Sequence, residues 1–145
     1  MEHNDLLSAR EQLVAGDFTC VICKDDRVYT TRERGVKPLV RWLTEGTDLR
    51  GFSAADKVVG KATAYLYCLL GVRAVYAHVM SRSAAQVLAD NGVAVSQGKL
   101  VDNIINRQGT GICPFEAAVW DIQTPQQALP AIRAKMTEMN ITLFD

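Results

Sequence analysis

Residues 54–96 read AADKVVGKATAYLYCLLGVRAVYAHVMSRSAAQVLADNGVAVS, and this stretch decides the fold. Its first part predicts a helix that begins near Asp56, runs through Leu70 and stops at Gly71. Apolar residues lie almost all round this helix, so we expect it to be the buried central one. The apolar run Val72–Met80 is typical of a strand that is covered on both faces.

A second helix and strand follow in the same stretch. Ser81 or Ser83 is expected to cap a helix over Ala84–Asn91, which Gly92 closes, and a strand begins at Val93. Outside the stretch we expect further elements: a helix capped by Asn4-Asp5, a hairpin of Phe18–Lys24 and Val28–Thr31, a helix from Pro38 to Gly46, a loop over 106–111, a short helix from Pro114 and a last helix over Pro125–Glu138. The order predicts an α/β fold, a three-layer α/β/α sandwich with a mixed sheet, in a single domain over residues 1–145.

Composition limits the classes of function. Sixteen basic residues balance sixteen acidic ones, and 48% of the 145 residues are apolar. This balance argues against nucleic acid or a membrane surface as the partner. The polar N-terminus is unlike a signal peptide, and the four cysteines lack the spacing of a disulfide framework, so we expect a cytoplasmic protein with reduced thiols.

The loop Gly109–Glu116 brings a hydroxyl, a thiol and a carboxylate together within eight residues. Cys113 before Pro114 would lie at a helix N-terminus, which favours a thiolate nucleophile, and Glu116 would be its base. The alternative is a buried structural cysteine and a capping carboxylate. Three nearby side chains are further candidates for ligand contact: Asn106, Arg107 and Thr110.

Asp56, Lys57 and Lys61 form a second candidate cluster at the start of the expected central helix. Asp56 would face a cleft as a nucleophile, and the two lysines, four residues apart, would meet one anion. The alternative is a carboxylate that favours the helix dipole beside two solvated lysines.

Ser81, Arg82 and Ser83 form a third cluster, between a strand and a helix, where phosphates often bind. A plain serine cap predicts the same residues. Arg32, Arg34 and Lys37 form a basic patch before Pro38, for which a solvated surface is the first interpretation and anion binding the second.

We find no pattern for a metal or a cofactor, and expect neither. Cys20 and Cys23 should point to opposite faces of a strand, and His78, in the middle of a strand with apolar neighbours, should be a hydrogen-bonded core histidine. The chain also lacks a Gly-x-Ser-x-Gly elbow, a phosphate-binding Gly-Lys-Ser/Thr loop and a dinucleotide fingerprint.

Three runs carry a resemblance to a known family: Arg32–Leu39, Ala55–Ala62 and Ile105–Glu116. In this order they resemble an uncharacterised bacterial family, a domain of unknown function with a cytidine deaminase-like fold. The resemblance spans roughly Leu13 to Ala134 and implies the fold more firmly than any activity.

The zinc motifs of cytidine deaminases are missing. Where the resemblance implies a His/Cys-x-Glu motif, the chain has Ala54-Ala55-Asp56, and where it implies Pro-Cys-x-x-Cys, the chain has Met80–Ala84. A catalytic zinc needs three protein ligands, so we do not expect zinc-dependent deamination.

The resemblance implies that the three clusters share one cleft. We therefore expect the chain to bind a nucleotide-like or phosphorylated small molecule there. The alternatives are a non-catalytic sensor, an oligomeric structural module (the chain would then form homo-oligomers), or a transferase or hydrolase with Asp56 or Cys113 as nucleophile.

Overall fold

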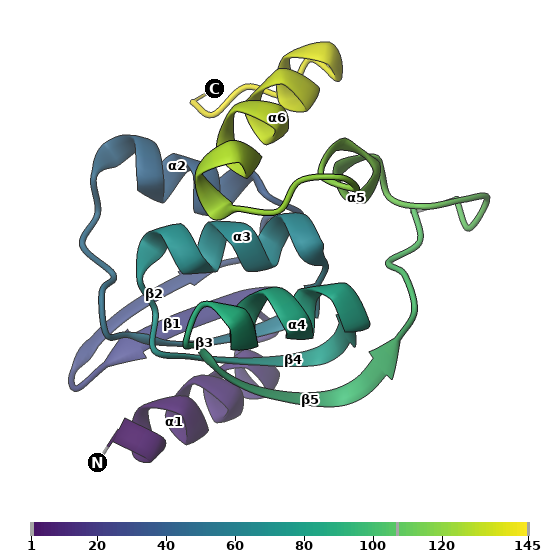
Figure 1. Ribbon diagram of the computed structural model, residues 1–145. Coiled ribbons are helices and arrows are strands. Elements are labelled where there is room, and N and C mark those ends of the chain that lie inside the picture. The colour runs from purple at the N-terminus through teal and green to yellow at the C-terminus, as the bar shows by residue number, and fades with distance from the viewer. Residues whose placement is uncertain (1, 107, 145) are drawn as a thin grey trace.

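Five strands form one mixed sheet in the order β2-β1-β3-β4-β5 (Figure 1). Their bounds are β1 Cys20–Lys24, β2 Arg27–Thr31, β3 Ser53–Val59, β4 Ala74–Ser81 and β5 Ala94–Val101. β1 pairs antiparallel with both β2 and β3, whereas β3, β4 and β5 run parallel. The computed structural model describes residues 2–106 and 108–144, with side chains from residue 5 onward within these ranges.

The described part of the chain also contains six helices. They are α1 Glu2–Ala15, α2 Lys37–Glu45, α3 Lys61–Leu70, α4 Arg82–Asp90, α5 Pro114–Ala118 and α6 Pro125–Glu138. In Figure 1, α1 lies on one face of the sheet, α3 and α4 lie on the other, and α6 lies outside α3. This arrangement confirms the predicted α/β class and the mixed sheet between helices.

The two faces of the sheet pack into two separate hydrophobic cores, as the side chains of β1 show. Cys20 and Ile22 are buried in the larger core with α3, whereas Val21 and Cys23 are buried in the smaller core beneath α1. Side chains of a strand alternate between its faces, so the prediction that the two cysteines point apart is confirmed.

The central strand, β3, was not predicted. Residues 53–59 form a strand between β1 and β4, and α3 begins only at Lys61, after Gly60. The placement of Asp56 and Lys57 in the first turns of a helix is therefore wrong. Ala54 and Ala55 have weak strand propensity, but both are completely buried on opposite faces, where small side chains let α1 and α3 approach the sheet.

Other boundaries differ by a few residues. β4 begins at Ala74 rather than Val72, and α1 begins at Glu2, ahead of the Asn4-Asp5 cap that we expected. Ser81 is the cap of α4, since its hydroxyl accepts a hydrogen bond from the Ala84 amide at 3.1 Å. The last helix has the predicted bounds, and Thr124 caps it. No helix among the described residues is long and apolar enough to span a bilayer.

Candidate functional site

A cleft of about 980 Å³ opens where α2 and α3 begin, beside the start of β1 and the last residues of β3. Most of its wall is apolar, with a few polar groups among the apolar side chains, as in many small-molecule sites. Its walls come from six parts of the chain: residues 19–20, 33–39, 56–58, 60 with 62–63, 104–116 in part, and 139 with 141.

Asp56 places a carboxylate in the wall of this cleft. Its side chain is half-buried on the α3 side of the sheet, and the Tyr67 hydroxyl donates a hydrogen bond to Oδ2 at 2.6 Å. Burial raises the pKa of Asp56 from 3.8 to about 6, although hydrogen bonds from Tyr67 and from the Val58 and Lys57 amides oppose the rise. A carboxyl with such a pKa is suited to exchange a proton near neutral pH.

Tyr67 and Cys20 hold the Asp56 carboxylate from the side of the buried core. The hydroxyl of Tyr67 lies 3.1 Å from the Cys20 sulfur, and both residues are buried. Because Tyr67 donates its one proton to Asp56, the Cys20 thiol is the donor to Tyr67. Burial and the nearby Asp56 charge raise the pKa of both the thiol and the phenol well above their ordinary values. The three groups therefore form a fixed chain from the core to the cleft, with Asp56 as its only ionised member at neutral pH.

Glu116 caps the start of α3 rather than its own helix. Its carboxylate accepts hydrogen bonds from the Lys61 amide at 2.9 Å and the Ala62 amide at 3.1 Å, and the residue is only 6% exposed. A Cβ at Gly60 would lie 2.6 Å from the carboxylate, so a larger residue there would displace the Glu116 side chain. The anion-binding end of α3 is thus filled by the protein's own carboxylate. This geometry matches the capping alternative and leaves Glu116 poorly placed as a base for Cys113.

The two lysines of the second cluster do not converge. The Lys57 ammonium lies 3.4 Å from an Asp17 carboxylate oxygen, and the Lys61 ammonium donates to the Trp120 carbonyl at 3.0 Å. They lie on different elements, β3 and α3, so the expected shared helix face does not exist. Lys57 lines the cleft, whereas Lys61 is not part of its wall.

Cys113 and Asn106 bring the Gly109–Glu116 loop to the cleft. Cys113 is half-buried before α5, and its amide donates to the Ile104 carbonyl at 3.0 Å. The Asn106 side chain bonds both the hydroxyl and the amide of Thr110, at 3.1 Å and 3.0 Å, so these two residues hold the turn together. Thr110 does not line the cleft, and Arg107 lies outside the described residues.

The third cluster lies apart from the cleft wall. Besides capping α4, Ser81 bonds the Ser83 hydroxyl at 3.2 Å, and Arg82 pairs with Asp102 at 2.9 Å on the surface. The structure therefore joins two of the three predicted clusters, around Asp56 and around Cys113, and leaves the serine turn elsewhere.

We did not predict Thr63 or Tyr67 at the site from the sequence, and we considered Cys20 only as a metal ligand or disulfide partner. Arg34 was interpreted first as part of a solvated surface. Arg34 is exposed in the cleft wall beside the start of α2, a helix whose first turn has no side-chain cap. The signal was the basic patch before Pro38.

His78 lies in β4, half-buried, with Nδ1 3.0 Å from the Tyr76 hydroxyl. The contact agrees with the predicted hydrogen bond, but His78 is only half-buried and belongs to neither core, so its placement in the core is wrong. Among the described residues, no three His, Cys, Asp or Glu side chains gather into a group that could hold a metal ion.

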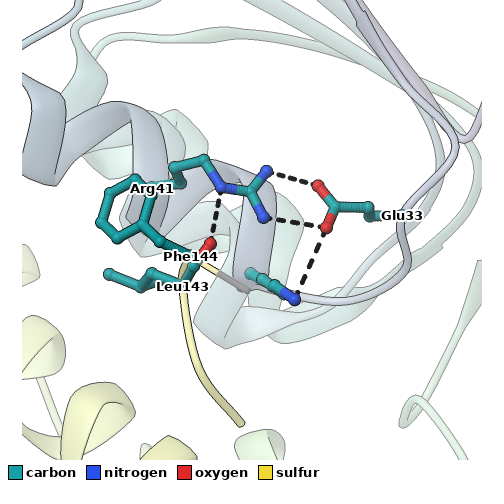
Figure 2. A pocket seen from close by; sticks show the side chains of 5 residues that line it. Glu33, Arg41, Leu143 and Phe144 are labelled. Atoms are coloured by element: carbon teal, nitrogen blue, oxygen red, sulfur yellow. Dashed lines mark hydrogen bonds and ion pairs between the residues drawn. The ribbon is translucent and has the colours of Figure 1, made fainter.

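A second, smaller hollow of about 490 Å³ lies against α2, near residues 143–144 (Figure 2). The Arg41 guanidinium forms a bidentate salt bridge with Glu33, and its Nε donates a hydrogen bond to the Leu143 carbonyl at 2.9 Å. Lys37 lies 3.7 Å from the same carboxylate, and hydrogen bonding to Arg41 lowers the pKa of Glu33. The charges in this hollow pair with one another and tie the C-terminal segment to α2.

Comparison with known proteins places the chain in a family. A model of the family described as a domain of unknown function, DUF1893, matches residues 8–136. The crystal structure of a DUF1893 family protein from Thermotoga maritima is similar over 93% of this chain and 92% of that one, with 25% identity and a TM-score of 0.84.

A weaker likeness is to a diaminohydroxyphosphoribosylaminopyrimidine deaminase/5-amino-6-(5-phosphoribosylamino)uracil reductase from the same organism. It covers 67% of this chain and 36% of that one, with 16% identity and a TM-score of 0.42. No curated protein matches the chain in sequence. The match over most of its length shows that the chain belongs to the DUF1893 family.

Proposed function

We propose that this protein binds a nucleotide-like, phosphorylated small molecule in the cleft between α2, α3 and α5. The observation that carries the proposal is the half-buried Asp56 carboxylate in a largely apolar wall, with the Arg34 guanidinium in the same wall. Apolar walls suit a flat heteroaromatic ring, a fixed carboxylate suits ring N–H groups, and an arginine suits a phosphate.

Charge supports this placement of the phosphate. Arg34 forms no ion pair or hydrogen bond with any described residue, so its guanidinium is available to a ligand. The first turn of α2 lies beside it, and its amides lack a side-chain cap, which adds a positive potential to that part of the wall. The start of α3, in contrast, is already neutralised by Glu116.

Chemistry in the cleft is the alternative, and one observation favours Asp56 over Cys113 for it. The pKa of Asp56 is raised to about 6, whereas the base expected for Cys113, Glu116, is bound to the α3 amides. A hydrolase or transferase built on this site would use Asp56 as its acid, base or nucleophile.

Thermal unfolding of the purified protein with a panel of nucleosides, nucleoside monophosphates and ribose 5-phosphate tests the proposal. A ligand at 100 times its Kd stabilises the folded state by about 2.7 kcal/mol, which raises the Tm of a chain of this size by roughly 5–10 °C. We expect such a rise with at least one monophosphate, and a smaller one with its nucleoside.

Arg34→Ala should remove most of the difference between monophosphate and nucleoside, because it deletes the phosphate contact. Arg82→Ala is the matched control, an exposed arginine outside the cleft, and should leave the rise unchanged. If no compound of the panel shifts the Tm of the unaltered protein, the proposal is wrong.

A further inference from the structure

The Asp56 carboxylate has acceptor positions that the protein leaves unfilled. The Tyr67 hydroxyl donates to Oδ2 at 2.6 Å and the Val58 amide donates to Oδ1 at 3.3 Å. An ionised carboxylate offers about two acceptor positions on each oxygen and no donor. The nearby Lys57 amide donates to the Thr19 carbonyl at 3.0 Å, so each oxygen of Asp56 keeps an acceptor position for a ligand, and no described residue forms a salt bridge with either oxygen.

Such a carboxylate is best satisfied by two N–H groups that lie side by side. Two parallel N–H donors match the spacing of the two oxygens, as in arginine–carboxylate pairs. The hydrogen bonds from Cys20 to Tyr67 and from Tyr67 to Asp56 hold the carboxylate in one orientation before any ligand binds. Binding therefore costs little conformational entropy at this side chain.

Nucleobases differ in what they present to such a pair of acceptors. Guanine presents two adjacent donors, the ring N1–H and the exocyclic amine. Adenine and cytosine present a donor beside an acceptor, and uracil presents a single ring N–H between two carbonyls. An acceptor turned toward Asp56 would leave two lone pairs facing each other in a half-buried site, which is costly.

We infer that the ligand of this cleft carries a guanine-type edge, two adjacent N–H donors that bind Asp56, with its phosphate toward Arg34. This inference rests on the proposed function and adds the identity of the base. Pterins share the same pair of donors, and the phosphate contact to Arg34 favours a guanine nucleotide over a free pterin.

Isothermal titration calorimetry at pH 8 with the full chain separates the candidates. The series contains GMP, IMP, AMP, CMP, UMP and neopterin, and IMP is the matched ligand because it lacks only the exocyclic amine of GMP. We expect GMP to bind about tenfold or more tightly than IMP, as a lost charge-assisted hydrogen bond predicts. Adenine, cytosine and uracil nucleotides should bind more weakly still.

Asp56→Asn tests the residue itself. Its amide replaces one acceptor with a donor, so the variant should lose the preference for GMP over IMP and bind XMP, whose second carbonyl replaces the amine, more tightly than GMP. Asp102→Asn, an exposed carboxylate outside the cleft, is the matched control and should keep the wild-type order. The GMP–IMP comparison on the unaltered chain stays decisive even if Asp56→Asn does not fold.

The outcomes distinguish the inference from the proposal beneath it. Equal binding of all the monophosphates, or a preference for AMP or CMP, would overturn the guanine-type edge and leave nucleotide binding in place. Tighter binding of neopterin than of GMP would reassign the ligand to pterins. A GMP preference that survives in Asp56→Asn would remove Asp56 from the recognition of the base. If nothing in the series binds, the proposed function itself is wrong.

Discussion

At the scale of single residues, Asp56 links the cleft to the stability of the fold. Its pKa in the folded protein is about 6, above the ordinary value of 3.8, because burial penalises the charged form. The folded state therefore holds the proton more tightly than the unfolded chain does. It follows that the contribution of Asp56 to the free energy of unfolding falls as the pH rises from about 4 to 6, and stays low above that.

Asp56→Asn should remove the loss of stability that ionisation of Asp56 causes above pH 4, and it adds a cost that does not vary with pH, because its amide turns a donor toward the Tyr67 hydroxyl or the Val58 amide. The shift of about two pKa units corresponds to at most about 3 kcal/mol at pH 7.5. The free energy of unfolding of the variant minus that of the wild type should fall toward its acid-side value near pH 4. Urea unfolding of both proteins from pH 4 to 8 measures this difference.

The comparison between the two proteins cancels the other titrating groups. Glu33 and Asp48 have lowered pKa values, so their contributions to the free energy of unfolding decrease as the pH falls. These decreases are the same in the wild type and in Asp56→Asn. If the difference in the free energy of unfolding between Asp56→Asn and the wild type does not change with pH, burial does not raise the pKa of Asp56.

At the scale of elements, the start of α3 depends on a contact across 55 residues of sequence. Glu116 supplies two acceptors to the Lys61 and Ala62 amides, and Gly60 leaves the space that the carboxylate fills. Glu116→Gln replaces one acceptor with a donor that faces an amide N–H. We expect it to lower the free energy of unfolding by about 1–3 kcal/mol. Glu138→Gln, an exposed carboxylate near the end of α6, is the control and should change it by less than about 0.5 kcal/mol.

Gly60→Ala tests the same contact from the other side. The φ of Gly60 is −99°, which alanine adopts readily, so any cost must come from the added Cβ against Glu116. We expect a loss of about 1–3 kcal/mol in the wild-type background. The loss should be smaller in a Glu116→Ala background, where the carboxylate is absent. Equal losses in both backgrounds in urea unfolding would refute the contact.

The elements also show where sequence patterns suffice and where they do not. The bounds of α6 and the turn at Asp25-Asp26 follow from local signals: a capping threonine, a proline and adjacent turn residues. β3 was missed because Ala54, Ala55 and two charged residues do not resemble a buried strand. Its strand conformation comes from pairing with β1 and β4 on either side. That pairing is tertiary, and no window of sequence contains it.

The site shows the same division. Asp56 and Cys113 were selected by residue type and local pattern, and the cleft brings them into one wall. The roles of Tyr67 and Glu116 could not be predicted in this way. Tyr67 reaches Asp56 only because α3 packs over β3, and Glu116 reaches α3 only because the chain returns after β5.

At the scale of the whole molecule, the four cysteines lie in different parts of the fold: the two cores, the contact between α3 and α4, and the cleft. Cys20 and Cys23 are buried on opposite faces of the sheet. Burial raises the pKa of Cys20 well above its ordinary value, raises that of Cys23, and raises that of Cys68 to about 11. Only Cys113 combines partial exposure with a position in the cleft wall.

A thiol titration with a chromogenic disulfide at pH 8 therefore reports the integrity of the fold. The folded protein should release about one equivalent quickly, because thiolate is the reactive form and Cys20, Cys23 and Cys68 are protonated at this pH. Cys113→Ser should abolish the fast phase, whereas Cys68→Ser should keep it. In denaturant all four thiols should react together. A fast phase that survives Cys113→Ser and is lost in the Cys113→Ser/Cys68→Ser double variant would assign it to the half-buried Cys68 between α3 and α4. A fast phase that survives both substitutions would show that Cys20 or Cys23 is open to solvent, and the packing of the sheet between α1 and α3 would have to be revised.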